Sequence, residues 1–445
     1  MEAQADTMQG IGRFMAGILP PDRPAHQRNF FERFALRFAF LYFFLSAWMW
    51  LDELVTGQTF FIRGTYNAVG SRLIPWVAKH LLHISGVVEK RNLHDSVYFC
   101  VELLCWVVVS VVLAFVWSLW DRRGRYDPLW HDLLRIFLRY TLAWIMVIYA
   151  WNKIINVQFK FPELPRLVEA YGDSSPMALL WFYMSYSHPY VVFGGLAELA
   201  GAVCLLFRRT TTLGALILLG VVGNVTFINF AYDISVKFLS LNLFLMVCVL
   251  LVPEVSRLTN FLVLNRPVEP LELGGEPRDR RFRMAKLAVK GVILADLLLP
   301  MPYHNVQRYK VEGPNAPKPP LYGIYSVEGL TEDGQSHPPL LTDTERWRYV
   351  IIDSTSNLVI RRMDDSAQEY AMTYDAKARR MTLQSEDSQP VKGVFAVSQA
   401  GPDSLQLQGN LGNDTLSLQL RRLDEKKMTL ISRGFHWISE KSFYK

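Results

Sequence analysis

The residues best suited to chemistry in this sequence are a few ionisable and amide side chains within or beside long apolar runs. Six side chains belong to this set: Lys153, Glu198, Asn224, Asn229, Asp233 and Lys237. An ionisable group at bilayer depth is costly, so it is a functional candidate by default. We expect an outward-facing polar pocket that binds a quinone carbonyl, a small thiol or a lipid headgroup.

The six side chains divide by role. Glu198, in a run rich in glycine and alanine, would shuttle a proton, and Lys237 would stabilise negative charge on a ligand oxygen. Lys153 would share that task, and it would bind the substrate together with the remaining amide and acidic side chains, Asn224, Asn229 and Asp233. The four cysteines form no CxxC pair and the histidines no facing pairs, so no metal site is expected.

Each of these residues also has a structural interpretation. Asp233 could cap the helix that follows it, and the two lysines could extend their amino groups to the membrane surface. Glu198 could be a packing group whose carboxylate is satisfied by a neighbour. A lone carboxylate inside a bilayer is either protonated or paired, and Lys153 and Lys237 are the nearby cations.

Seven apolar runs position these residues, and each reaches the length needed to cross a bilayer when its flanks are included. The runs are Phe34–Leu51, Val97–Leu119, Leu133–Ile148, Tyr190–Phe207, Leu213–Phe230, Phe238–Val252 and Leu287–Met301. They predict a multi-pass α-helical membrane protein with about seven transmembrane helices.

Basic residues gather between these runs and predict the orientation of the chain. With seven spans, the basic blocks before the first run, after the second and fourth, and between the sixth and seventh fall on one side. The positive-inside rule makes that side the cytoplasm and places the C-terminal part outside. The net charge of +6 therefore gives no indication of nucleic-acid binding.

Two of the basic blocks share a spacing. Arg33 and Arg37 open the first run, and Arg135 and Arg139 open the third, in both cases four residues apart on one helix face. The repeat indicates either a duplicated helix pair or arginines that extend to the membrane surface.

The last 120 residues have a different pattern, with short alternating segments separated by turn residues. The predicted strands are Trp347–Ile352, Leu358–Arg362, Glu369–Tyr374, Arg380–Leu383, Gly393–Val397, Ser404–Gly409, Thr415–Arg421 and Met428–Ser432. They favour an all-β barrel or sandwich. The aromatic-rich ending suggests a final strand that fills the core or a surface that docks on the membrane part. We divide the chain into a membrane domain (1–305), a proline-rich linker (306–322) and an extracytoplasmic β-domain (323–445).

The third to sixth runs resemble the DoxX family of four-helix bacterial membrane proteins over residues 130–253. The resemblance rests on Lys153 at the end of one helix, on Glu198 in a glycine-rich helix, and on the Asn224, Asp233 and Lys237 set. This chain has Trp151 where the family commonly has glycine, and it adds two spans in front and one behind. The resemblance implies a bacterial inner-membrane protein, in some members part of a quinone-reducing or thiol-homeostasis complex.

Two functions remain open from the sequence. The first is a membrane redox component with a quinone as candidate ligand; it would need a redox partner protein, because no motif for an electron carrier is present. The second is a non-enzymatic scaffold, or a protein that binds lipid or a small ligand through its external β-domain. The sequence does not decide whether the chain is an enzyme, nor its oligomeric state.

Overall fold

The computed structural model describes residues 29–54, 60–84, 94–268 and 300–444, with short gaps. Within these ranges it leaves out residues 123, 125, 162, 314, 315, 355, 386–390 and 402, and between 269 and 299 it describes only 284, 287, 288, 291 and 295. The chain forms two compact units, one of residues 1–159 and 187–308, and one of residues 160–186 and 309–445. Each unit is described by itself.

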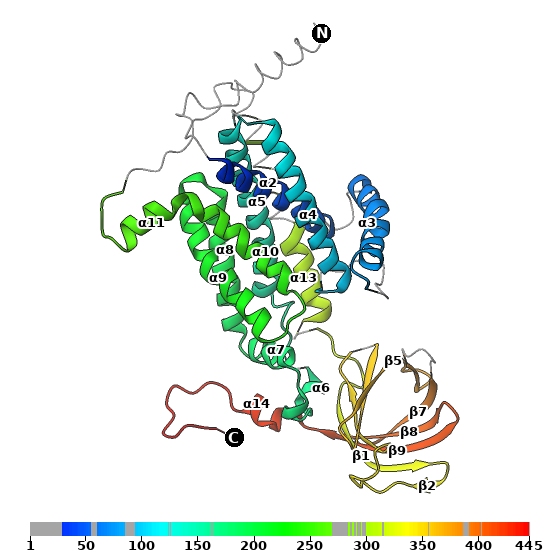
Figure 1. Ribbon diagram of the computed structural model, residues 1–445. Coiled ribbons are helices and arrows are strands. Elements are labelled where there is room, and N and C mark those ends of the chain that lie inside the picture. The colour runs from blue at the N-terminus through cyan, green and yellow to red at the C-terminus, as the bar shows by residue number, and fades with distance from the viewer. Residues whose placement is uncertain are drawn as a thin grey trace. The chain divides into compact units, whose positions relative to one another are not determined.

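The first unit is a bundle of long apolar helices (Figure 1). Its elements are α2 (Phe30–Leu54), α3 (Phe60–His80), α4 (Val97–Trp120), α5 (Asp127–Ile154), α8 (His188–Leu206), η2 (Arg208–Thr210), α9 (Thr211–Ala231), α10 (Lys237–Leu251), η3 (Val252–Glu254) and α11 (Val255–Leu262). The helix α13 (Pro300–Glu312) lies where the division between the two units falls.

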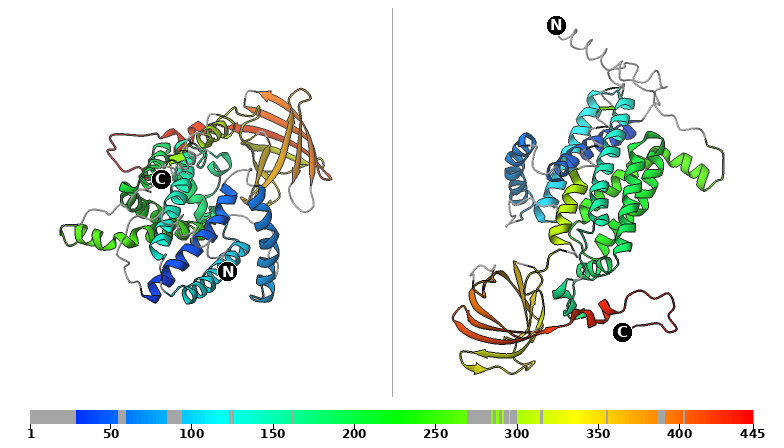
Figure 2. Two further views of the ribbon diagram at one scale, coloured as in Figure 1. Left: turned by 90° about the horizontal axis from the view of Figure 1, so that it is seen from above. Right: turned by 180° about the vertical axis from the view of Figure 1, so that it is seen from behind.

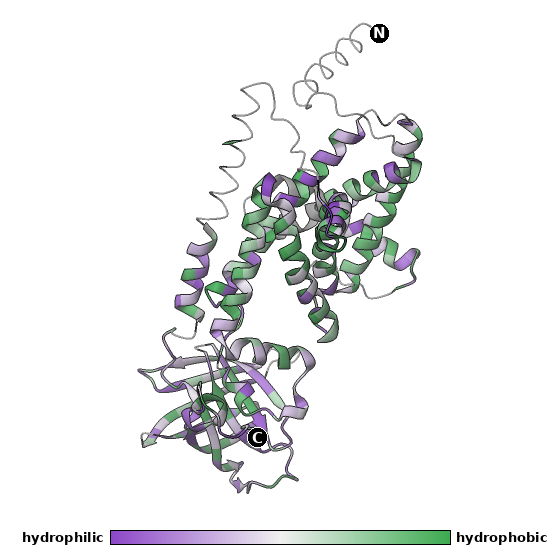
Figure 3. Cartoon of the chain, turned by 90° about the vertical axis from the view of Figure 1, so that its left-hand side faces the viewer, coloured by the Kyte–Doolittle hydropathy of each residue, from purple (hydrophilic) through white to green (hydrophobic). Residues whose placement is uncertain are grey.

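Five helical stretches of the described chain are long and apolar enough to cross a membrane. They are Val97–Trp120, Asp127–Ile154, His188–Leu206, Arg208–Ala231 and Lys237–Leu262. In Figure 3, where the chain is coloured by hydropathy, the bundle helices are predominantly green, whereas the second unit is more mixed in colour. The predicted fold class, a multi-pass helical membrane protein with a C-terminal β-domain, is therefore confirmed. The seventh predicted span, Leu287–Met301, lies mostly outside the described residues.

Small residues let α8 and α9 pack closely. A Cβ atom added at Gly214 of α9 would lie 2.8 Å from the carbonyl oxygen of Gly201 in α8, so α9 can approach α8 only without a side chain there. Close backbone approach through glycine is a common way for membrane helices to gain packing contacts. The apolar core continues along α5, α8 and α10 through Leu142, Leu205 and Met246.

The second unit contains a closed eight-stranded barrel (Figure 2). Its strands are β1 (Gly323–Glu332), β3 (Trp347–Ile352), β4 (Asn357–Arg362), β5 (Ala367–Asp375), β6 (Arg380–Ser385), β7 (Lys392–Gly401), β8 (Ser404–Leu411) and β9 (Asp414–Leu423). Each pairs antiparallel with the next, and β1 pairs with β9, Ile324 opposite Leu423, to close the barrel. The short strand β2 (Gln335–Ser336) pairs antiparallel with the end of β1.

Alternating side chains fill the barrel. Inward-facing residues such as Phe395, Met381 and Leu418 are fully buried and form one apolar cluster. At one end of the strands, Arg346 is buried and donates hydrogen bonds to the carbonyl oxygens of His337 (2.8 Å), Trp347 (2.9 Å) and Val327 (3.2 Å). The interior is thus a packed core, as in small barrels whose side chains fill the lumen.

The segment between α5 and α8 belongs to this second unit. It contains α6 (Leu164–Leu167), η1 (Tyr171–Asp173) and α7 (Pro176–Tyr186). Leu164 is completely buried against Ile324, Ile351 and Val359 on the outer face of the barrel. The carboxylate of Asp353 accepts a hydrogen bond from the backbone amide of Leu164, and burial raises the pKa of this carboxyl.

The chain after β9 differs from the sequence prediction. Met428–Ser432 was expected to be a strand, but Thr429–Ser432 forms the short helix α14, preceded by η4 (Glu425–Lys427). β9 has already closed the barrel against β1, so no open edge remains for a further strand. The aromatic ending does not fill the core either, because Trp437 is 92% exposed.

Candidate functional site

Lys153 and Glu198 form a buried ion pair between α5 and α8. The ammonium group of Lys153, in the last turn of α5, donates to Oε1 of Glu198, in the middle of α8. Only 2% of Glu198 and 8% of Lys153 are exposed. The paired arrangement is what a carboxylate at this depth requires.

Gly195 makes this pair possible. It lies one helical turn before Glu198, and a Cβ atom there would lie 2.9 Å from the carbonyl oxygen of Ala150 and 3.0 Å from Cβ of Lys153. α8 therefore contacts the last turn of α5 through bare backbone, which brings the two charged side chains together. By contrast, a Cβ atom at Gly194 would meet nothing within 4 Å.

The bonding of the pair is incomplete. Oε2 of Glu198 is buried and has no hydrogen-bond partner among the residues that the structure describes. The ring of Tyr149, one turn before Lys153 on α5, has its centroid 5.9 Å from the lysine nitrogen. A buried carboxylate oxygen of this kind can accept a hydrogen bond from a hydroxyl or amine of a bound molecule.

Lys237 lies in a different cluster. Its ammonium group is 2.7 Å from Asp233 and 3.8 Å from Asp95, the residue two positions before α4. The carboxylate of Asp95 also accepts hydrogen bonds from the backbone amides of Lys237 (2.8 Å) and Phe238 (3.2 Å). Asp95, rather than Asp233, thus satisfies the first amides of α10, while the side chain of Asp233 is largely exposed.

The two candidate asparagines on α9 have different surroundings. Asn229 is buried, and its backbone carbonyl oxygen accepts a hydrogen bond from the backbone amide of Ile234 at 2.9 Å. Asn224 is exposed on the surface of the bundle. Of the six candidate side chains, the structure thus joins Lys153 with Glu198 and Lys237 with Asp233, in two separate clusters.

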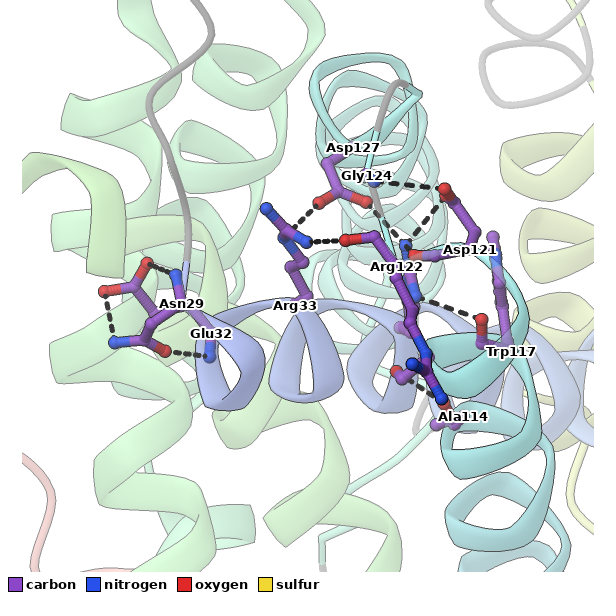
Figure 4. A network of polar contacts seen from close by, with 11 residues as sticks. Asn29, Glu32, Arg33, Ala114, Trp117, Asp121, Arg122, Gly124 and Asp127 are labelled. Carbon is purple, nitrogen blue, oxygen red and sulfur yellow. Dashed lines mark hydrogen bonds and ion pairs between the residues drawn. The ribbon is translucent and has the colours of Figure 1, made fainter.

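A larger charged cluster, not considered as a site in the sequence analysis, lies at the opposite end of α5 (Figure 4). Arg37 of α2 is fully buried and donates to Asp121 Oδ2 at 2.9 Å and to Asp127 Oδ1 at 3.0 Å. It also donates to the carbonyl oxygens of Trp117 (3.2 Å) and Asp121 (3.1 Å) at the end of α4. Arg33 adds an ion pair with Asp127 at 3.4 Å. The cluster joins α2, α4 and α5.

In both copies of the repeated arginine spacing, the second arginine donates hydrogen bonds to carbonyl oxygens at the end of a neighbouring helix. On α5, Arg139 donates two hydrogen bonds to the carbonyl oxygen of Leu205 at the end of α8, as Arg37 does to carbonyls at the end of α4. Arg135 pairs with Glu254 at 3.2 Å. The spacing was visible in the sequence, but the partners lie 66 to 119 residues away. We call this end of the bundle, with Arg37, Arg139 and Glu254, the arginine end.

Metal ligation has no support in the described part of the chain, where no group of three or more His, Cys, Asp or Glu side chains comes together. The four cysteines are free and partly buried. The candidate site consists of the Glu198 carboxylate, the Lys153 ammonium and the ring of Tyr149.

No family model and no solved structure matches the chain. The chain is 36% identical over 113 residues to the uncharacterized protein YwoB of Bacillus subtilis (strain 168), a match that covers 25% of this chain and 71% of that protein. Through this region, the chain belongs to the same family as YwoB.

Proposed function

We propose that this chain is a DoxX-like integral membrane protein of the bacterial cell envelope that binds a small redox-active molecule, a quinone or a reduced sulfur compound, at Lys153 and Glu198. One observation carries the proposal: Glu198 is buried, and among the described residues only one of its two oxygens has a partner. Leaving a buried acceptor unsatisfied costs about 1–3 kcal/mol, which a bound donor would remove.

The chemistry of the pair suits such a ligand. The hydroxyl of a quinol, or a thiol, donates a hydrogen bond that Oε2 of Glu198 accepts. The ammonium of Lys153 stabilises negative charge on a ligand oxygen or sulfur. Because the pair has no electron carrier of its own in this proposal, a redox partner protein supplies or accepts the electrons.

The proposed orientation places this pair in the outer half of the membrane. Arg33, Arg37, Arg135 and Arg139 all lie at the arginine end, which the positive-inside rule assigns to the cytoplasm. Lys153 lies at the other end of α5 and therefore faces outward, and the C-terminal barrel is extracytoplasmic in the same arrangement. Accessibility of single cysteines to a membrane-impermeant thiol reagent in whole cells tests this orientation.

The second candidate is a binding role for the barrel unit without catalysis. Buried apolar side chains line the inside of the barrel. A cavity of about 150 Å³ lies instead in the segment that contains α6 and α7, lined by Lys160, Phe161, Glu163, Arg166, Trp181 and Phe182 among others. Its mixed charges and aromatic rings favour a small zwitterionic or polar ligand.

The decisive experiment is mass spectrometry of small molecules that copurify with the full chain in mild detergent. Wild type and Glu198→Gln are compared with Glu254→Gln, a control that alters another buried glutamate of the same bundle. We expect a quinone or sulfur compound in wild type and control, and its loss in Glu198→Gln. If all three preparations carry the same molecules, the pair is not the binding site.

A double variant separates binding from stability. Glu198→Gln alone leaves the charge of Lys153 without its partner, whereas Lys153→Met combined with Glu198→Gln removes both charges. Since a missing partner is what destabilises a buried pair, we expect the double variant to regain most of the thermal stability. It should still fail to bind ligand. If the double variant regained both thermal stability and ligand binding, Lys153 and Glu198 would not be the binding site.

A further inference from the structure

The segment Arg433–Tyr444, which follows α14, carries large apolar side chains that are not covered by the protein. Phe435, Trp437, Ile438 and Tyr444 are each more than three-quarters exposed. Soluble surfaces rarely leave so many large apolar groups together in water, and such patches mark contact sites. This feature is independent of the proposed ligand at Lys153 and Glu198.

Two ring contacts lie within the segment. The rings of Phe435 and Trp437 meet edge to face with centroids 5.1 Å apart, and the guanidinium of Arg433 lies 4.1 Å from the ring of Phe443. The segment thus gathers aromatic rings with two basic residues, Arg433 and Lys441, and one acidic residue, Glu440, on a stretch of twelve residues. Rings with one polar edge, next to Lys or Arg, are typical of the membrane–water interface.

The attachment of the segment points to the same environment. Met428, just before α14, packs in one cluster with Leu164 and Leu167 of α6. Both Figure 1 and Figure 2 show α14 beside α6. The chain that carries α6 and α7 continues without interruption into α8 at His188 and follows α5. The segment therefore begins at the part of the barrel unit that is joined directly to two helices able to cross a membrane.

We propose that Arg433–Tyr444 binds the lipid headgroup region of the bilayer that the helices cross. In this arrangement Trp437 and Tyr444 insert their rings at the level of the headgroups, and Arg433 and Lys441 lie next to lipid phosphates. A core-filling role is excluded by the exposure of the rings, and the association of aromatic with basic groups favours lipid over an apolar protein surface.

The test uses the full chain in lipid nanodiscs, with the four native cysteines replaced by alanine. An environment-sensitive fluorophore is attached at Ser442→Cys or, as a control, at Ala376→Cys in the exposed turn between β5 and β6. Quenching by lipids that carry a nitroxide near the headgroup is then measured at both positions. We expect quenching several-fold greater at position 442 than at position 376, and a large decrease at 442 when Trp437→Ser is added.

The alternatives give distinct results. Equal quenching at the two positions would overturn the proposal, and so would strong quenching at 442 that Trp437→Ser leaves unchanged. A fluorophore at 442 that is shielded from a water-soluble quencher, yet not quenched by the nitroxide lipid, would show that the segment covers protein instead. Because Trp437 is 92% exposed, its replacement should leave the barrel folded, which circular dichroism checks.

Discussion

Glu254 and Glu198 are two buried glutamates in one helix bundle, 3% and 2% exposed, and they are bonded differently. At the arginine end, Glu254 has an arginine on each oxygen, Arg135 at 3.2 Å and Arg257 at 2.6 Å. At the other end of α5, Glu198 has Lys153 on one oxygen and no described partner on the second. The comparison separates a buried glutamate whose two oxygens are both paired from one with a single described partner.

The same contrast appears in the cations. Arg37 makes four hydrogen bonds, two to carboxylates and two to helix-end carbonyls, and it joins three helices. Lys153 makes its hydrogen bond to a single carboxylate and joins two helices. A guanidinium with several partners in fixed geometry holds helices in place, while an ammonium on a flexible stem can adjust to a ligand.

Replacing Arg37 should have the largest effect and tests whether the arginine end is structural. Arg37→Ala leaves Asp121 without its cation and Asp127 with Arg33 alone. We expect a loss of about 3–5 kcal/mol in the free energy of unfolding, because Arg37 is the buried donor of four hydrogen bonds that join three helices. Thermal unfolding in detergent measures it, with Arg135→Ala as the control, since Glu254 keeps Arg257. Equal losses in both variants would contradict this interpretation.

Substitution of Gly195 tests how closely α8 must approach α5 at the Lys153–Glu198 pair. Gly195→Ala inserts a methyl group within 3 Å of backbone and side-chain atoms of α5, so we expect a loss of about 1–3 kcal/mol together with weaker ligand retention. Gly194→Ala, in open space, is the matched control and should be neutral or slightly stabilising, since alanine favours helix by about 1 kcal/mol. If both variants behave alike, close approach does not position the pair.

A smaller effect, which depends on pH, is expected at the Asp343–His337 pair of the barrel unit, which water can reach. The hydrogen bond between Asp343 and His337, at 3.0 Å, lowers the pKa of the Asp343 carboxyl. A lowered carboxyl pKa adds stability above the unfolded pKa, and this stability disappears as the pH falls through the folded pKa. Asp343→Asn should therefore cost about 1 kcal/mol at neutral pH and nothing in strong acid. The free energy of unfolding of wild type and Asp343→Asn is measured from neutral to acidic pH. The difference between the two proteins should disappear at the acidic end.

Much of the fold could be predicted from the sequence because its patterns are local. Apolar runs predicted the membrane helices, and alternation with turn residues predicted strands such as Trp347–Ile352 with their observed bounds. The last predicted strand was wrong because a short apolar segment, Met428–Ser432, has no feature that distinguishes a ninth barrel strand from a helical turn.

The candidate site was predictable only in part. Lys153 and Glu198 were named together because an isolated carboxylate in a membrane needs a cation. The sequence could not tell which lysine provides it, since that depends on the approach of α8 to α5 at Gly195. Asp95 and Asp121 were missed because they lie outside the apolar runs, at helix ends where acidic residues usually remain in water.

The packing of Leu164 against the outside of the barrel has a consequence for any attempt to divide this protein. Residues 160–186 lie between α5 and α8 in the chain but fold with residues 309–445. A protease that cuts once in the proline-rich stretch 316–320 would yield two peptides that remain associated through this packing. Removal of the barrel by truncation would instead leave an apolar surface on the remaining chain, so loss of ligand binding in such a truncated protein would not show that the barrel contacts the ligand.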